Sequence, residues 1–129
     1  MNHDVVVAVT YNPEIEKFLL VKRAESRDRY PGEWEFPSGF LEDETEREGA
    51  LRELEEETGL IGKTIKTAEP FTVESGEYHF TIHPVLVIVE SDEVELTREH
   101  DKFEWVKRDQ IDGFETVPQL EKDMRVLGV

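Results

Sequence analysis

Apolar residues recur in short β-type runs separated by turn residues. In the first part of the chain, residues 4–11 and 18–23 are rich in β-branched and aromatic side chains, and Asn12 and Pro13 lie between them. Two such runs joined by turn residues predict a β-hairpin. Residues 30–39 have turn residues at both ends and a short aromatic stretch in the middle, which predicts an extended segment leading into a glycine turn.

The spacing of residues 45–58 predicts a helix. Thr45 and Glu48 form a capping-box pattern at its start, and Gly59 follows its last residue as a stop signal. A narrow apolar stripe faces the core and consists of Ala50, Leu51 and Leu54.

The second half of the chain is mostly β-rich. Residues 64–73 and 78–89 predict a long hairpin that turns at Ser75 and Gly76. Shorter strands are expected at 94–96 and 103–106, and a closing helix at 120–127, begun near Pro118. Strands around a central helix, with a second helix downstream, predict one α+β domain over residues 1–129, an α/β/α sandwich built on a mixed sheet.

The composition narrows the classes of partner. With 15 Lys and Arg against 31 Asp and Glu, the net charge is −16, which argues against duplex nucleic acid as a ligand. A second interpretation of this acidity is a surface adapted to high salt, which screens self-repulsion. The apolar runs are shorter than the roughly 20 residues of a membrane helix, so no membrane partner is expected. The absence of cysteine and of a signal-like start predicts a cytoplasmic protein.

Three glutamates share one face of the predicted helix. Glu53, Glu56 and Glu57 are three and four positions apart, where like charges destabilise a helix. A solvated acidic face is one interpretation, but Arg52 beside the cluster can orient a carboxylate, which favours a magnesium site. No cysteine is present and the four histidines lack ligand spacing, so zinc is not expected, and His79 and His83 are assigned structural roles.

The segment around these glutamates resembles the Nudix box. That pattern is a glycine, five residues, Glu, seven residues, then Arg-Glu-apolar-x-Glu-Glu-x-Gly-apolar. Residues 52–60 supply the whole second half, and seven residues separate Glu44 from Arg52. Only four residues separate Gly39 from Glu44, which indicates a loop shortened by one residue, and Ser38 stands where many members carry a further glycine.

The likeness extends to both sides of the box. Residues 31–37, Pro-Gly-Glu-Trp-Glu-Phe-Pro, are similar to the matching stretch of MutT-like nucleoside triphosphate pyrophosphohydrolases. Glu99 and His100, followed by residues 103–106, resemble the late acidic loop and strand of the same family.

The resemblance implies a set of site residues. Arg52 orients Glu53, and either Glu53 or Glu99 acts as the catalytic base. Arg23, at the end of the second strand, binds a phosphate, and Gln119 stands near the asparagine that selects purines in the family. Magnesium, with manganese as a possible substitute, is bound by Gly39, Glu44, Glu53, Glu56 and Glu57.

The resemblance also implies an activity. The leading interpretation is a magnesium-dependent enzyme, monomer or homodimer, that cleaves nucleoside triphosphates, oxidised ones included, to monophosphate and pyrophosphate. The alternatives are a hydrolase of ADP-ribose and nucleotide sugars or of dinucleoside polyphosphates, and a non-catalytic Nudix module that senses nucleotides. Retention of Glu44, Glu53, Glu56 and Glu57 favours an enzyme over the sensing module.

Overall fold

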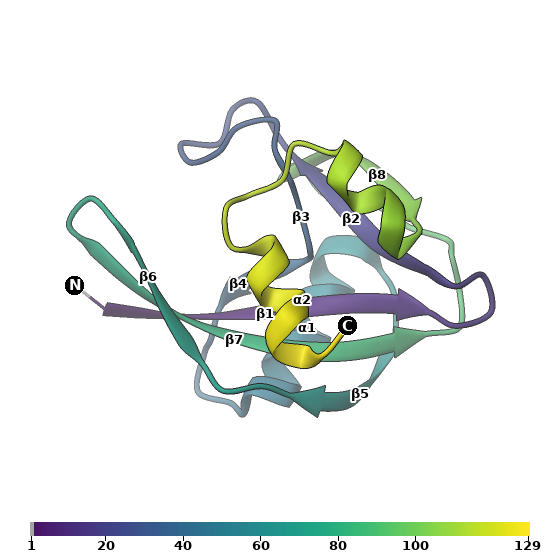
Figure 1. The fold of residues 1–129 in the computed structure, drawn as a ribbon, viewed down its shortest axis with the longest axis horizontal. Coiled ribbons are helices and arrows are strands. Elements are labelled where there is room, and N and C mark those ends of the chain that lie inside the picture. The colour runs from purple at the N-terminus through teal and green to yellow at the C-terminus, as the bar shows by residue number, and fades with distance from the viewer. Residues whose placement is uncertain (1) are drawn as a thin grey trace.

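The computed structural model describes residues 2–129, which form a mixed β-sheet with a helix on each face (Figure 1). The helices are α1 (Glu46–Thr58) and α2 (Leu120–Leu127), and a 3-10 helix, η1 (Arg108–Gly113), precedes α2. The strands are β1 (Asn2–Asn12), β2 (Lys17–Arg23), β3 (Trp34–Glu35), β4 (Ser38–Phe40), β5 (Gly62–Thr67), β6 (Phe71–Ser75), β7 (Tyr78–Val89) and β8 (His100–Val106).

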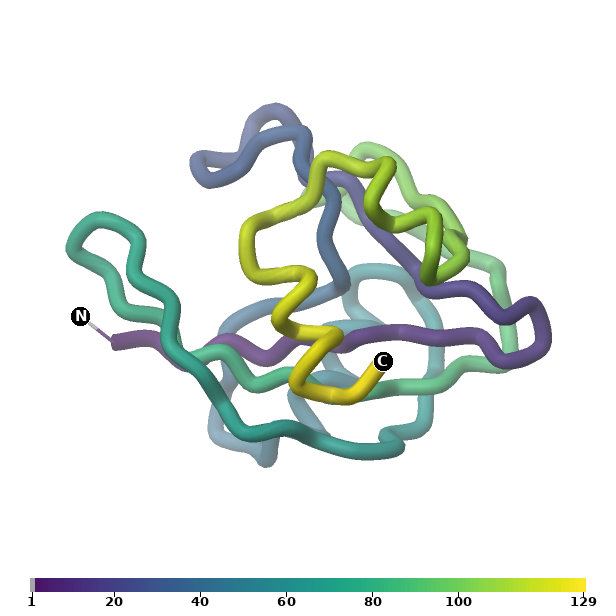
Figure 2. Tube along the Cα trace, in the orientation of Figure 1, coloured from purple at the N-terminus to yellow at the C-terminus, as the bar shows by residue number. Residues whose placement is uncertain are grey.

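A parallel pair of long strands forms the centre of the sheet. β1 pairs with β7 along nearly its whole length, from Asn2 opposite His79 to Tyr11 opposite Ile88. All other pairings are antiparallel: β2 and β4 join β1, β5 and β6 join β7, and β3 and β8 join β2. The tube view follows this order from β2 through β1 and β7 to β5 (Figure 2). The predicted mixed sheet and the hairpin of residues 4–11 and 18–23 are confirmed.

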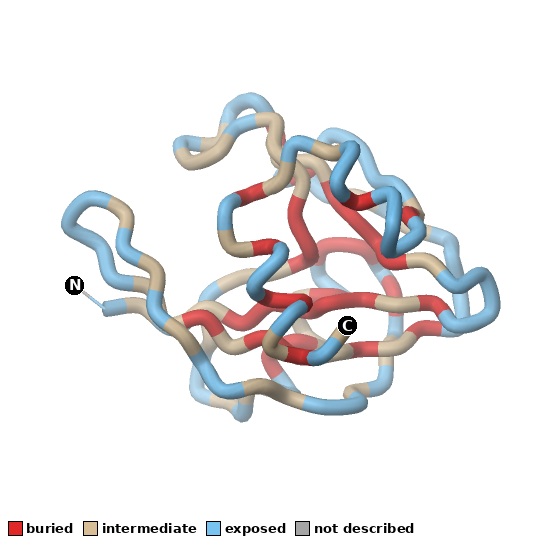
Figure 3. The backbone as a smooth tube through the Cα atoms, in the orientation of Figure 1, coloured by how far each residue is buried: buried red, intermediate tan, exposed pale blue. Residues whose placement is uncertain are grey.

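Both faces of the sheet are buried, and each packs against a different helix. Side chains alternate along a strand, so Val7 and Val9 join the core under α2, while Val6 and Ala8 join the core under α1. Burial of both faces explains why the strands read as continuous apolar runs. Figure 3 shows the buried positions concentrated in the central strands. This arrangement confirms the predicted α/β/α sandwich.

The predicted boundaries of α1 are confirmed to within one residue. The Thr45 hydroxyl accepts from the Glu48 backbone N–H at 3.1 Å, and the Glu48 carboxylate accepts from the Thr45 N–H at 2.9 Å. Gly59 ends the helix with φ of 77°, a left-handed conformation that glycine adopts without steric cost. The register of α1 is therefore set at both ends, which fixes the direction of its glutamates.

Several predicted elements in the second half were wrong in detail. Residues 64–73 are two strands, β5 and β6, because the chain breaks before Phe71 at Pro70. Residues 94–96 are not a strand; instead Val94 and Leu96 pack against the core under α1.

Three short elements were not predicted. β3, β4 and η1 are too short for a periodic pattern to reveal them. β3 and β4 are important for the site described below, because Glu35 in β3 and Gly39 in β4 lie close to the C-terminal half of α1. Among residues 2–129, no helix is long and apolar enough to span a membrane.

Candidate active site

A cleft of about 640 Å³ opens beside α1, β2 and β4. Its carboxylates include Glu53, Glu56 and Glu57 from α1 and Glu99 from the loop before β8. Its other charged side chains are arginines, which come from the end of β2, the loop that follows it and residue 98. The cleft therefore brings a concentrated negative charge and a separate group of cations to one place.

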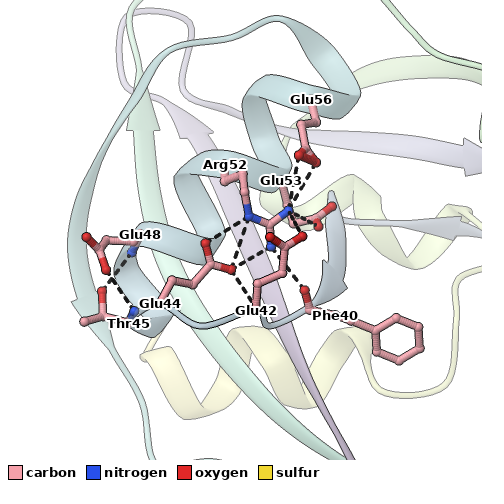
Figure 4. Close-up of polar contacts among 8 residues, drawn as sticks. All are labelled: Phe40, Glu42, Glu44, Thr45, Glu48, Arg52, Glu53 and Glu56. Atoms are coloured by element: carbon pink, nitrogen blue, oxygen red, sulfur yellow. Dashed lines mark hydrogen bonds and ion pairs between the residues drawn. The ribbon is translucent and has the colours of Figure 1, made fainter.

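One guanidinium group organises the acidic side of the cleft (Figure 4). Arg52 donates to Glu44 from two nitrogens, at 2.9 and 2.7 Å, and to Glu53 at 2.7 Å and Glu56 at 3.1 Å. It also donates to the Phe40 carbonyl at 3.1 Å, which ties the segment before α1 to the helix. The hydrogen bonds with Arg52 hold the pKa of Glu44 below its usual value. Arg52 thus contacts Glu53 directly, and the predicted role of Arg52 in orienting Glu53 stays a prediction.

Glu53 and Glu57 face each other from successive turns of α1. Each of the two carboxyl groups influences the pKa of the other. Burial is the largest cause that raises the pKa of each, and for Glu57 the hydrogen bond with Glu53 and the charges of Glu35 and Glu99 raise it further. The pair therefore has a high affinity for positive charge.

The donor set fits a hard divalent cation. Glu57 Oε1 is buried and lacks a hydrogen-bond partner among residues 2–129, although its other oxygen accepts from the Ser38 N–H at 3.1 Å. An unpaired buried carboxylate oxygen is costly unless a cation or proton meets it. Glu56 is exposed at the edge of the same cleft and adds a further oxygen donor. Several carboxylates at an open site, with room for water and phosphate, match magnesium.

Gly39 makes room for Glu53. A Cβ atom at position 39 would lie 2.3 Å from the Glu53 carboxyl carbon and 2.4 Å from both of its oxygens. Any larger residue at position 39 would therefore displace the Glu53 carboxyl group from its present position.

A buried polar network lies behind the glutamates. Glu35 accepts from Arg23 Nη1 at 2.9 Å and lies 2.8 Å from His100 Nε2, and His100 Nδ1 lies 3.5 Å from Glu57 Oε1. Glu35, Glu57 and His100 are close enough together to hold a metal ion. Because the Arg23 guanidinium already occupies Glu35, we interpret these side chains as a hydrogen-bonded network that backs Glu57.

The segment that builds this cleft matches a known protein family. A model described as the NUDIX domain matches residues 1–126. The chain belongs to the Nudix family. The acidic helix, the glycine turn before it and the strands that flank both lie within the matched residues.

The Nudix chain is similar to proteins of several kinds. It is 42% identical over 60 residues to an ADP-sugar pyrophosphatase of Mus musculus, covering 46% of this chain and 28% of that protein. It is 35% identical over 115 residues to diphosphoinositol polyphosphate phosphohydrolase 3-alpha of Mus musculus, covering 76% and 68%. Among solved structures, a MutT protein from Methanosarcina mazei Go1 has a TM-score of 0.79 at 30% identity and covers 95% and 88%. The chain spans just over a quarter of the length of the first of these relatives.

The structure brings most of the predicted Nudix residues together. The cleft is lined by Arg23, Gly39, Glu53, Glu56, Glu57 and Glu99. Glu44 is not among the lining residues, because Arg52 engages both of its carboxylate oxygens. The metal contact of Glu44 therefore stays a prediction, and the structure places this side chain as a partner of Arg52.

Gln119 lies in a smaller chamber that adjoins the cleft. This chamber of about 120 Å³ shares six lining residues with the cleft, including Arg23, Arg29 and Glu35, and most of its other lining residues are apolar. Gln119 lines this chamber and not the cleft that holds Glu53, Glu56 and Glu57.

Two buried members of the site were missed by the sequence analysis. Glu35 is 5% exposed and His100 is 4% exposed. An acidic residue inside the short aromatic run of residues 34–36 was the available signal for Glu35, since a charged residue in an apolar strand is rarely buried without a partner. His100 gave no comparable signal, because its partners come from distant elements.

Substitution of Gly39 tests the close approach of β4 to α1. The Gly39→Ala variant is expected to displace the Glu53 carboxylate and to weaken binding of Mg²⁺ or Mn²⁺ by at least about tenfold. Isothermal titration calorimetry with Mn²⁺ measures this loss. Gly113→Ala is the matched control, because a Cβ there meets nothing within 4 Å. Unchanged Mn²⁺ affinity in Gly39→Ala would contradict the placement of Glu53 in the metal site.

Proposed function

We propose that this Nudix protein is a magnesium-dependent hydrolase that cleaves a phosphoanhydride bond of nucleoside triphosphates, releasing a nucleoside monophosphate and pyrophosphate. The observation that carries the proposal is the buried carboxylate of Glu57, whose Oε1 makes no hydrogen bond among residues 2–129 and which lines one cleft with Glu53 and Glu56. Membership of the Nudix family and the likeness to a MutT protein support the same reaction.

Carboxylates from α1 would hold the divalent cation. Glu53, Glu56 and Glu57 are the donors, and manganese is a possible substitute for magnesium. A bound divalent cation neutralises charge on phosphate oxygens and lowers the pKa of a coordinated water. Arg52 keeps Glu53 in one orientation through a 2.7 Å hydrogen bond, so the geometry is set before substrate arrives.

The base that accepts the proton from water is Glu53 or Glu99. Both side chains face the cleft, and Glu99 approaches it from the loop opposite α1. Glu53 is partly buried and bonded to Arg52, whereas the Glu99 side chain is exposed and forms no ion pair among residues 2–129. Comparison of Glu53→Gln and Glu99→Gln by pH–rate profile distinguishes them, since loss of the base removes the acidic limb of the profile.

The smaller chamber suits the nucleobase. Its lining combines apolar side chains with the Gln119 amide, which can both donate and accept a hydrogen bond. A triphosphate whose phosphates lie along the cleft would place its nucleoside in this direction. In the same proposal, Gln119 determines which nucleobase the protein prefers.

A substrate panel tests the proposed reaction. Canonical and oxidised nucleoside triphosphates, ADP-ribose and dinucleoside polyphosphates are incubated with Mg²⁺, and the products are identified by mass spectrometry. Monophosphate plus pyrophosphate from triphosphates is the expected result. Turnover confined to ADP-ribose would overturn it, and this outcome is a real alternative because of the likeness to an ADP-sugar pyrophosphatase.

Substitution of Arg23 tests whether its guanidinium binds a phosphate of the substrate. Arg23→Ala is expected to raise the KM for triphosphates, because its guanidinium faces the cleft from the end of β2. The same change leaves Glu35 without an ion-pair partner, so Arg23→Lys is the control that retains the charge. An unchanged KM in a folded Arg23→Ala variant would remove Arg23 from substrate binding.

A further inference from the structure

Arginine is concentrated in the cleft to an unexpected degree. The chain has eight arginines and seven lysines, and four of the arginines line the cleft while no lysine does. These four are Arg23, Arg27, Arg29 and Arg98. Guanidinium groups bind phosphate oxygens in a bidentate fashion, which an ammonium group cannot do. The cleft therefore contains arginine in particular and not simply positively charged residues.

Three of these arginines form no ion pair with an acidic side chain among the described residues 2–129. Arg23 donates from Nη1 to Glu35 at 2.9 Å and from Nε to the Arg29 carbonyl at 2.8 Å, so its charge is already paired with a carboxylate. The ion pairs formed by residues 2–129 do not include Arg27, Arg29 or Arg98. Their positive charge is available to an anionic ligand. The glutamates on the other side of the cleft would repel the same ligand unless a cation were bound to them.

Arg29 is held in place by aromatic rings. Its guanidinium carbon lies 4.7 Å from the centre of the Tyr78 ring and 5.0 Å from that of the Phe80 ring. The two rings stack with an interplanar angle of 21°, and Phe80 itself lines the cleft. Stacking orders the flat guanidinium and leaves the N–H groups at its edge free to donate.

We propose that Arg27, Arg29 and Arg98 form a subsite for phosphate groups beyond the two that flank the scissile bond. The inference rests on the proposed function, in which the glutamate side of the cleft holds the scissile diphosphate through the cation. A terminal phosphate carries a charge of about −2 near neutral pH and needs cations of its own. The substrate therefore carries at least three phosphates, and compounds with only a diphosphate leave this subsite empty.

Clustered phosphates occur in two chemical forms. One is the linear chain of a nucleoside triphosphate or a dinucleoside polyphosphate, and the other is a ring that carries several phosphate groups. The apolar chamber that holds Gln119 favours the linear chain with a nucleoside attached. Inhibition by a nucleoside tetraphosphate is compared with inhibition by inositol hexakisphosphate to distinguish the linear form from the ring form. Inhibition by either compound that weakens in the arginine variants supports the subsite and identifies which form of clustered phosphate it binds.

The first test measures selectivity. In the Arg27→Gln/Arg98→Gln double variant and in Arg29→Gln, kcat/KM for a nucleoside triphosphate is expected to fall at least tenfold, whereas kcat/KM for ADP-ribose changes less than threefold. Arg125→Gln is the matched control, since this exposed arginine of α2 does not line the cleft. Equal losses for both substrates, or no loss for the triphosphate, would overturn the subsite.

The second test does not depend on catalysis. Binding of inorganic tripolyphosphate is measured by isothermal titration calorimetry in EDTA, so that the arginines alone attract the anion. Binding by the unmodified protein that weakens at least tenfold in the arginine variants supports the subsite, even if no substrate of the panel is hydrolysed and the proposed function fails. Affinity that is the same in all variants would overturn the subsite, even if triphosphates are hydrolysed.

Discussion

The Glu57→Gln variant is expected to lose at least about 1000-fold in turnover of nucleoside triphosphates while its fold stays intact. Glu57 supplies the buried oxygen that has no partner among residues 2–129, and the amide that replaces it carries no negative charge for a cation. The size of the side chain is unchanged, so packing under α1 is preserved. Steady-state kinetics with Mg²⁺, together with circular dichroism, measure the two parts of this result.

Glu55→Gln is the matched control for Glu57→Gln. Glu55 lies on the same helix with an exposed side chain that does not line the cleft, so the same chemical change there is expected to leave turnover within about twofold of the unmodified protein. Near-normal activity in Glu57→Gln would exclude the metal-site assignment. Equal losses in both variants would point to a general effect of reducing the charge of α1.

The Asp123→Asn variant is expected to be more stable than the unmodified protein at alkaline pH. Asp123 is 2% exposed on the core-facing side of α2, and its Oδ1 has no hydrogen-bond partner among residues 2–129. Burial, with a smaller contribution from the charge of Glu35, raises the pKa of Asp123 to about 8. The folded protein therefore binds this proton more tightly than the unfolded chain, whose value is 3.8.

The sign of the pH dependence follows from that difference. The contribution of Asp123 to stability is complete below the unfolded value of 3.8 and is lost as the pH rises through about 8. Urea denaturation at pH 5, 7 and 9 is expected to show an advantage of Asp123→Asn that grows with pH and reaches roughly 2–4 kcal/mol. Asp112→Asn, at an exposed position, serves as the control. An advantage that does not change with pH would contradict a buried, protonated Asp123.

Local patterns in the sequence were sufficient to predict α1 and its bounds. The capping box at Thr45 and Glu48 and the terminal Gly59 determine where α1 begins and ends, and helical spacing then determines that Glu53 and Glu57 meet. The central strands were predicted for a similar reason, because burial on both faces gives long apolar runs. In both cases the information lies within a few neighbouring residues.

The remaining features of the site depend on contacts between distant segments. Glu35 and His100 meet at 2.8 Å although 65 positions separate them, and no local pattern encodes that contact. The stacking of Arg29 on Tyr78 likewise joins a loop to the tip of a hairpin. Residues 94–96 have the composition of a strand but form an irregular segment, in which the Glu95 N–H donates to the Thr58 carbonyl at the end of α1.

The parallel pairing at the centre of the sheet has a consequence for how the chain folds. β1 precedes the other strands described here, yet its long partner, β7, begins only at Tyr78. The apolar residues of β1 therefore stay incompletely paired until the residues of β7 have been synthesised. Pairing between segments so far apart in sequence is slow, because a large loop has to close before any contact compensates for the lost entropy. Early refolding intermediates are expected to protect the amides of α1 from hydrogen exchange before those of β1.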